Sequence, residues 1–220
     1  MRVVDVSHPL GPDSPPYPGS EPPTFRAAGR ISEHGFAELR LGLCTHTGTH
    51  LDAPSHVLTH GPTLDRLPAG RFVGPGQVLD LRACQGRCIR VEDLAGLGAG
   101  PGPGGFVLLW TGMDAAFGRP EYFTAHPPLE PEAAQVLAGL GLSGVGLDAA
   151  SPDRFDDAGL PIHRILLSGG LVLVENLTNL ERLPASGFLF ACLPLALEGG
   201  DGSPVRAVGL VGGPARPPTE

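Results

Sequence analysis

Short apolar runs separated by glycine and proline recur along the whole chain. Runs of about four to eight apolar residues, bounded by turn-forming residues, are typical of β-strands. In one of them Leu39, Leu41 and Leu43 alternate with an arginine and a glycine, which predicts a strand with one buried face. The pattern predicts strands at 3–6, 39–43, 78–81, 106–110, 145–147, 171–174, 188–192 and 205–211.

Helical patterns are fewer and shorter than the strand patterns. Pro131 opens an alanine- and leucine-rich run that ends at Leu140, directly before Gly141. Proline in the first turn and glycine after the last turn are typical of a helix. Two shorter helices are predicted at 91–97 and 161–167.

Composition and loops indicate one loop-rich domain. Of the 220 residues, 33 are glycine and 25 are proline, but Leu, Ile, Val and Phe together number 60, which is above the range of disordered chains. The proline-rich stretches at 11–23 and 98–105 are interpreted as surface loops, because neither separates halves of different composition. We therefore predict a single strand-heavy α+β domain at 1–211, followed by a loose tail at 212–220.

Charge and residue usage exclude several classes of function. The formal charge is -8 and all 15 basic residues are arginine, so nucleic acid and anionic membranes are poor partners and a catalytic or phosphate-binding lysine is impossible. No apolar run reaches the roughly 18 residues of a membrane span, and the N-terminus turns polar too early for a signal peptide. Four cysteines in a chain of this length do not form a disulfide framework, so we expect a cytoplasmic protein.

Four of the eight histidines fall within residues 46–60, in the sequence CTHTGTHLDAPSHVLTHG. The core of this cluster is His46-x3-His50-x-Asp52-x3-His56. Imidazole nitrogen and carboxylate oxygen are ligands that Zn, Mn and Fe accept from proteins. A polar loop with chance histidines is the alternative, but three histidines and one aspartate at this spacing favour a metal site.

The spacing of the cluster also predicts its local shape. Positions 46, 50, 52 and 56 differ by even numbers, so on an extended backbone they would share a face. Gly48 and Pro54 prevent a regular strand through the whole segment, and we expect a strand end that runs into a tight turn. His60 lies outside the pattern and is expected at the surface.

A second part of the site is expected from the sequence PIHRILLSGGLVLVENLTNL at 161–180. His163 lies on a predicted short helix, and Glu175 follows the apolar strand at 171–174. A carboxylate at the mouth of a buried strand needs a counter-charge, which a metal ion supplies. The residues alone leave a second interpretation open, in which Glu175 is solvated and His163 caps its helix or faces water.

The segment HTGTHLDAPSH resembles the HxGTHxDAPxH motif of the cyclase-like metal-dependent hydrolases, a family that includes bacterial kynurenine formamidase (arylformamidase) and isatin hydrolase. Further segments that resemble the family run the length of the chain: VDVSHPL near the N-terminus, YPG at 17–19, WTG at 110–112, GLDAASPD at 146–153 and HRILLSGGLVLVENLTNL at 163–180. The resemblance implies a swivelling β/β/α fold, assembled as a homodimer or higher homo-oligomer.

The resemblance also implies a set of metal ligands. His46, His50 and Asp52 would bind one divalent ion, and His163 and Glu175 would complete a binuclear centre. Asp52 and Glu175 would be shared between the two ions. Isatin hydrolase-like members have glutamine at the position of Glu175 and hold one Mn ion, so glutamate here favours two Zn(2+) ions per subunit, with Mn(2+) as the alternative.

The implied activity is hydrolysis of N-formylkynurenine to kynurenine and formate, a step of tryptophan catabolism. Zinc lowers the pKa of a bound water to about 7 and so provides hydroxide, and His56 would serve as the acid/base. A cyclic amide or lactone, opened by the same machinery, is the nearest alternative substrate. A metal-binding module without catalysis is the alternative from another class. The expected partner is a small aromatic amide, with no nucleic acid and no membrane.

Overall fold

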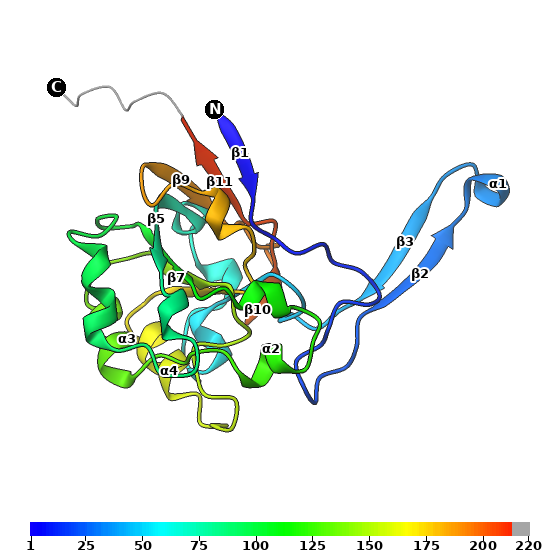
Figure 1. Ribbon diagram of the computed structural model, residues 1–220. Helices are drawn as coiled ribbons and strands as arrows, with labels where there is room; N and C mark the ends of the chain where they lie inside the picture. The colour runs from blue at the N-terminus through cyan, green and yellow to red at the C-terminus, as the bar shows by residue number, and fades with distance from the viewer. Residues whose placement is uncertain (213–220) are drawn as a thin grey trace.

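The computed structural model describes residues 1–212; residues 213–220, and with them nearly all of the predicted tail at 212–220, lie outside the described part. Nine strands form one curled, mixed sheet in the order β1-β11-β9-β5-β6-β7-β8-β4-β10 (Figure 1). The pairs from β5 to β8 are parallel, and the remaining pairs are antiparallel. The strands are β1 Arg2–Asp5, β4 His50–Asp52, β5 Val73–Asp80, β6 Phe106–Trp110, β7 Gly144–Leu147, β8 Val172–Glu175, β9 Phe188–Ala191, β10 Gly202–Pro204 and β11 Val208–Val211.

The central parallel strands are apolar on both faces, because both faces of the sheet are covered. Within β6, Val107 and Leu109 belong to the core on the helical side, whereas Phe106 and Leu108 belong to the core on the opposite side. The second core is closed by residues of β1 and β9. The layering is therefore helices, parallel strands, and a curled antiparallel part.

The helices are short and gather on one side of the parallel strands. Helix α3, Pro131–Ala138, packs against α4, Pro161–Ser168, and both contribute to the core on that side (Figure 1). Helix α2 spans Glu121–Thr124. Short 3-10 helices fill many connections, at Pro54–His56, Leu64–Arg66, Ala69–Phe72, Arg82–Cys84, Val91–Leu97, Met113–Ala116 and Leu180–Arg182.

Strand β5 joins the parallel and antiparallel parts of the sheet. Its first half pairs with β9 and its second half with β6, and Gly76 takes part in both pairings. A Cβ atom on Gly76 would lie 2.2 Å from Cε2 of Phe188, so glycine is needed for β9 to approach. Gly76 therefore lies where the antiparallel and parallel parts of the sheet meet.

A separate two-stranded arm projects from this body (Figure 1). It consists of β2, Thr24–Gly29, and β3, Glu38–Gly42, joined by α1, Ile31–His34. The prediction that the strand at 39–43 has a buried face is wrong for the single chain, because Leu39 is 63% and Leu41 is 50% exposed. The alternation correctly indicated that one face of β3 is apolar. Among the described residues β3 pairs only with β2, and the apolar face stays exposed.

The fold class is confirmed as a single α+β domain. All eight predicted strands overlap strands of the structure, and the helices predicted at 131–140 and 161–167 are present as α3 and α4. The segment 91–97 forms a 3-10 helix, strands β2 and β10 were not predicted, and β4 corresponds to the strand end expected within 46–56. Within residues 1–212, no helix is long and apolar enough to cross a membrane.

Candidate metal centre and active site

The cluster at 46–56 runs from a turn through a short strand into a 3-10 helix. Gly48 has a φ of 66°, a left-handed conformation that favours glycine, and it turns the chain into β4. His50 and Asp52 then lie on the strand, and His56 ends the 3-10 helix Pro54–His56. The expected strand end and tight turn are present, although only positions 50 and 52 share a strand.

Pairing of β4 with β8 places the two halves of the sequence prediction side by side. His50 lies directly opposite Glu175, and Asp52 lies opposite Leu173, two residues along β8. His163 comes from the first turn of α4, on the helical side of the same strands. The sheet register, rather than proximity in sequence, therefore joins the histidine cluster to Glu175.

Asp153 fixes the orientation of His163. Its carboxylate accepts hydrogen bonds from the backbone N–H groups of Ile162, at 2.7 Å, and His163, at 3.0 Å. It also accepts one from Nδ1 of the His163 ring at 2.5 Å. Nε2 of His163 is thereby directed to the two acidic residues, 3.2 Å from Oε1 of Glu175 and 3.5 Å from Oδ2 of Asp52.

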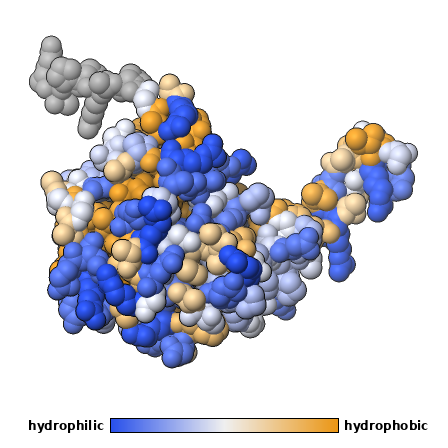
Figure 2. Space-filling model, in the orientation of Figure 1, coloured by the Kyte–Doolittle hydropathy of each residue, from blue (hydrophilic) through white to orange (hydrophobic). Residues whose placement is uncertain are grey.

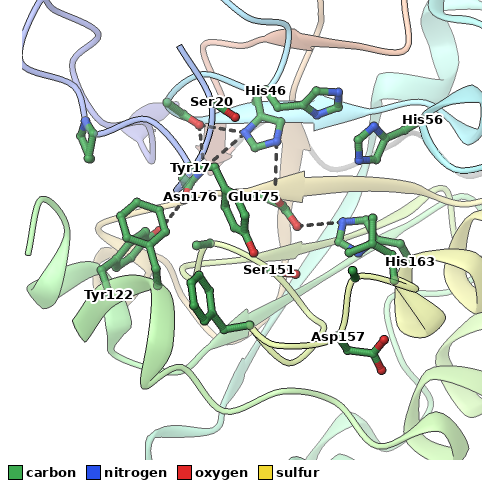
Figure 3. A pocket seen from close by; sticks show the side chains of 18 of the residues that line it. Tyr17, Ser20, His46, His56, Tyr122, Ser151, Asp157, His163, Glu175 and Asn176 are labelled. Carbon is green, nitrogen blue, oxygen red and sulfur yellow. Dashed lines mark hydrogen bonds and ion pairs between the residues drawn. The ribbon is translucent and has the colours of Figure 1, made fainter. Parts of the chain in front are cut away.

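The two carboxylates each face several imidazoles, as Figure 3 shows for Glu175. Oδ1 of Asp52 lies 2.7 Å from Nδ1 of His46 and 3.3 Å from Nε2 of His50. Oε2 of Glu175 lies 3.3 Å from the same Nε2 of His50. Asp52 and Glu175 thus hold the central positions, with histidines around them.

Burial and unsatisfied atoms show that this centre fits a cation. Asp52 is 0% and Glu175 is 5% exposed, and among residues 1–212 no arginine forms an ion pair with either carboxylate. Within residues 1–212, the buried atoms Asp52 Oδ2 and Glu175 Oε1 accept no well-directed hydrogen bond, and both lie near one imidazole nitrogen, Nε2 of His163. One imidazole between two such acceptors leaves a desolvation cost that a further positive group would offset. Imidazole nitrogens and carboxylate oxygens together form a donor set for a divalent metal ion.

The site contains two overlapping groups of donor residues, and within each group the donor atoms lie within 4.8 Å of one another. One contains His50, Asp52 and Glu175, and the other contains His46, Asp52 and His56. Asp52 belongs to both groups, as a carboxylate shared between two ions would. His56 lies close enough to His46 and Asp52 to be a metal ligand by distance alone. Its charge state, rather than its position, distinguishes it from the other site histidines.

The pKa of His56 differs in direction from those of the other site histidines. Burial lowers the pKa of His56, and the attraction of Asp52 only partly offsets this. For His50 burial also acts downward, but hydrogen bonds to Asp52 and Glu175 raise its pKa to about 10. His56 is therefore the neutral imidazole of the cluster near pH 7, able to accept a proton.

The centre lies in the wall of a cavity of about 430 Å³. Figure 3 shows Tyr122 on the opposite side of this cavity from His163, with Tyr17 between them. Tyr17 comes from the proline-rich loop at 11–23, and its ring meets Phe123 edge-on at 5.8 Å. The cavity is lined by aromatic rings and by the site itself: Tyr17, Phe117, Tyr122, Phe123, Phe155, His46, His50, His56, His163 and Glu175.

Asn176 ties the two halves of the site together. It follows Glu175 with a φ of 57°, a left-handed conformation that asparagine tolerates. Its amide donates to the Gly48 carbonyl at 2.8 Å, and its Oδ1 accepts from the Tyr122 hydroxyl at 2.6 Å. Nδ1 of His50 donates to the same Gly48 carbonyl at 2.9 Å, so Asn176 fixes the turn that orients His50.

The structure brings together all the predicted site residues, His46, His50, Asp52, His56, His163 and Glu175, and leaves His60 exposed as expected. Sequence reasoning missed Asp153, Asn176 and Asp201, which contact these residues. Asp153 could have been found from its place in the segment GLDAASPD, and Asn176 from its place directly after Glu175. Asp201 lies far along the chain and carried no signal.

Comparisons with known proteins agree with this geometry. The family model described as putative cyclase matches residues 4–154. A kynurenine formamidase of Salinibacter ruber is 36% identical over 211 residues, which cover 94% of this chain and 97% of that protein. The solved structure of isatin hydrolase A from Labrenzia aggregata superposes with a TM-score of 0.85 at 28% identity, over 96% of this chain and 93% of that one. A potential metal-dependent hydrolase with cyclase activity superposes with a TM-score of 0.78 at 30% identity, over 97% of this chain and 99% of that one.

Proposed function

Since the chain belongs to the cyclase family, we propose that it is a metal-dependent amidohydrolase that converts N-formylkynurenine to kynurenine and formate. The observation that carries the proposal is the buried group of histidines and carboxylates in the wall of an aromatic cavity. The relative in Salinibacter ruber, named for this activity, matches nearly the whole chain, and this supports the same substrate.

The ligand set of the proposal comes from four structural elements. His46, His50, Asp52, His163 and Glu175 would hold the metal, with both carboxylates shared between two Zn(2+) ions and Mn(2+) as the alternative. The two overlapping donor groups and the two unpaired carboxylate oxygens support a binuclear centre. A divalent ion held there supplies Lewis acidity, which lowers the pKa of a water molecule and polarises an amide carbonyl.

His56 would manage the proton in this reaction. Hydrolysis adds the oxygen of water to the formyl carbon, breaks the C–N bond and delivers a proton to the aniline nitrogen as it leaves. A neutral imidazole with a lowered pKa can accept the proton of water and pass it to that nitrogen. The ring of His56 lies 5.7 Å from that of His163, beside the buried centre, which supports this role.

The aromatic rings of the cavity would bind and orient the substrate. Tyr17, Phe123 and Phe155 form one group, with ring centres 5.8 Å and 6.2 Å from Tyr17. Such rings favour stacked or edge-on contacts with the aniline ring of a substrate. Seating that ring at the wall would place the formyl group toward the buried carboxylates and exclude bulk water.

A cyclic amide or lactone is the second candidate substrate, favoured by the TM-score of 0.85 with an isatin hydrolase. An open cavity beside the ligand set speaks against a metal-binding module without catalysis, because structural metal sites are closed. The zinc-loaded protein, assayed with N-formylkynurenine, isatin and an aromatic lactone, tests the choice. We expect the highest kcat/KM for N-formylkynurenine; a higher value for either ring substrate would reassign the activity.

The proposed assembly is a homodimer or higher homo-oligomer of cytoplasmic subunits, each with its catalytic domain at 1–211. An isolated two-stranded ribbon is marginal in water. The arm nevertheless exposes four large apolar side chains, Ile31, Phe36, Leu39 and Leu41. Figure 2 shows hydrophobic colour on the arm, and a second copy of the chain would cover this apolar surface. Four unpaired cysteines support a reducing compartment. Light scattering should give at least twice the mass of one chain; a monomer would contradict the proposed assembly.

A further inference from the structure

Asp201 lies immediately before β10, on the side of β4 that faces away from β8. The Asp201 carbonyl accepts a hydrogen bond from the backbone N–H of Ala53 at 2.9 Å, which fixes it beside the end of β4. In the next position, Gly202 pairs with Asp52. The backbone therefore holds the Asp201 side chain at the edge of the histidine cluster, although it lies outside the segment that resembles the family motif.

The Asp201 carboxylate faces two histidines with different proposed roles. Its Oδ2 lies 3.1 Å from Nε2 of His46 and 3.7 Å from Nδ1 of His56. The two rings lie against each other, with centres 4.0 Å apart. On its other side His46 Nδ1 lies 2.7 Å from Asp52, so two carboxylates hold the His46 ring at its two nitrogens.

The backbone at Gly202 packs against the His46 ring. A Cβ atom on Gly202 would lie 2.7 Å from Cε1 and 3.1 Å from Nε2 of His46. The imidazole thus packs directly against the main chain at 202, with the carboxylate of Asp201 at its edge. The ring has little freedom to turn while Asp201 accepts its proton.

We propose that Asp201 is a positioning residue that sets the orientation of His46 and of His56, and that it strengthens the binding of a divalent metal ion through His46. This rests on the proposed function. A metal-ligating histidine usually donates its other ring N–H to a carboxylate, which fixes the tautomer and raises the basicity of the ligating nitrogen. With Asp201 at Nε2, the ligating nitrogen of His46 is Nδ1, which faces Asp52.

The position of Asp201 distinguishes a role in orienting His46 and His56 from a role in substrate binding. Asp201 does not line the aromatic cavity, whereas His46 and His56 do. Loss of its carboxylate should therefore weaken metal binding and lower kcat but leave KM unchanged. A role in substrate binding would move KM, and a role limited to the fold would move neither metal affinity nor kcat in the folded protein.

The test compares Asp201→Asn with a matched variant, Asp65→Asn. Asp65 is an exposed carboxylate that accepts hydrogen bonds from Gly199 N, at 3.1 Å, and from Thr63 Oγ1, at 2.6 Å. It supports the same turn and carries the same charge as Asp201, but its hydrogen bonds involve no histidine. Metal-free proteins are titrated with Zn(2+) in competition with a chromophoric chelator, and kcat and KM are measured after zinc saturation.

We expect Asp201→Asn to weaken Zn(2+) binding about 10–100-fold, with a fall in kcat at saturating zinc and an unchanged KM. Asp65→Asn should bind Zn(2+) as the unaltered protein does. Asp201→Ala, which cannot accept a hydrogen bond at all, should lose at least as much affinity. Equal Zn(2+) affinity in Asp201→Asn and the unaltered protein, or equal weakening in Asp65→Asn, would overturn the proposal.

Zinc binding is read directly, so the result does not depend on the substrate. If the unaltered protein binds Zn(2+) but does not hydrolyse N-formylkynurenine, the proposed substrate fails while the role of Asp201 is still decided by the titration. If the unaltered protein binds no divalent ion, both the metal centre and the role of Asp201 are overturned.

Discussion

Binding of metal should release protons from the histidines of the centre. Burial alone would lower the pKa of His50, but hydrogen bonds to Asp52 and Glu175 raise it to about 10. The pKa values of His46 and His163 are raised as well, again because hydrogen bonds to carboxylates outweigh burial. A ligating nitrogen must give up its proton, so we expect filling of the centre at pH 7 to release about two to three protons per subunit.

The free energy involved follows from the pKa of His50. The interval between about 10 and pH 7 is about three pH units, and each unit corresponds to about 1.4 kcal/mol. Removing this proton at pH 7 therefore costs about 4 kcal/mol, and the observed free energy of metal binding is weaker by that amount. Because the protonated imidazole cannot ligate, Zn(2+) affinity should rise with pH until the pKa of His50 is passed.

The proton count is measured by calorimetric titration of the metal-free protein with Zn(2+) in buffers of different ionisation enthalpy. His60→Ala is the control, because His60 is exposed and outside the centre, and it should release as many protons as the unaltered protein. An affinity that stays constant from about pH 6 to about pH 9, with no proton release, would refute the assignment of these histidines as ligands.

Replacing His56 with alanine should leave zinc bound and lower kcat about 10²–10⁴-fold, since acid/base help is lost; loss of zinc in metal analysis would make His56 a ligand instead. Asn176→Ala removes the hydrogen bonds to Gly48 and to the Tyr122 hydroxyl and should reduce the free energy of unfolding by about 1–3 kcal/mol in urea, more than Tyr122→Phe, which removes one of them. Equal losses in the two variants would mean that the bond to Gly48 contributes nothing. Tyr17→Ala should raise KM with zinc content unchanged, because Tyr17 lines the cavity; an unchanged KM would place the substrate elsewhere.

The strands of the parallel core could be predicted because both of their faces are buried. In β6 every position meets one of the two cores, and in β8 Val172, Leu173 and Val174 do, so the apolar runs overlap these strands. Strand β10 was missed, and β4 was expected only as a strand end without bounds, because both are three residues long and carry polar or small residues. The alternation in the arm predicted an apolar face correctly but not what covers it, because a covering surface is not encoded in the strand itself.

The site could be predicted where several donor residues lie close in sequence. His46, His50, Asp52 and His56 form such a group, and Glu175 was visible as a charge at the end of an apolar strand. The sheet register that places Glu175 opposite His50 could not be read from the chain. Asp153 lies in the segment GLDAASPD, but its contact with His163 depends on how that segment packs against α4. Asp201 reaches His46 from 155 residues along the chain, and an isolated aspartate carries no pattern that reveals such a contact.

Hydrolysis of N-formylkynurenine by the metal-stripped and reloaded protein tests the central claim most directly. The protein is treated with a chelator, assayed, loaded with Zn(2+) or Mn(2+), and assayed again with the bound metal counted per subunit. We predict no turnover after stripping and restored turnover with two ions bound, with Asp52→Asn as a matched variant that stays inactive because both donor groups share this carboxylate. Turnover that survives complete removal of metal, or full activity in Asp52→Asn, would contradict the account.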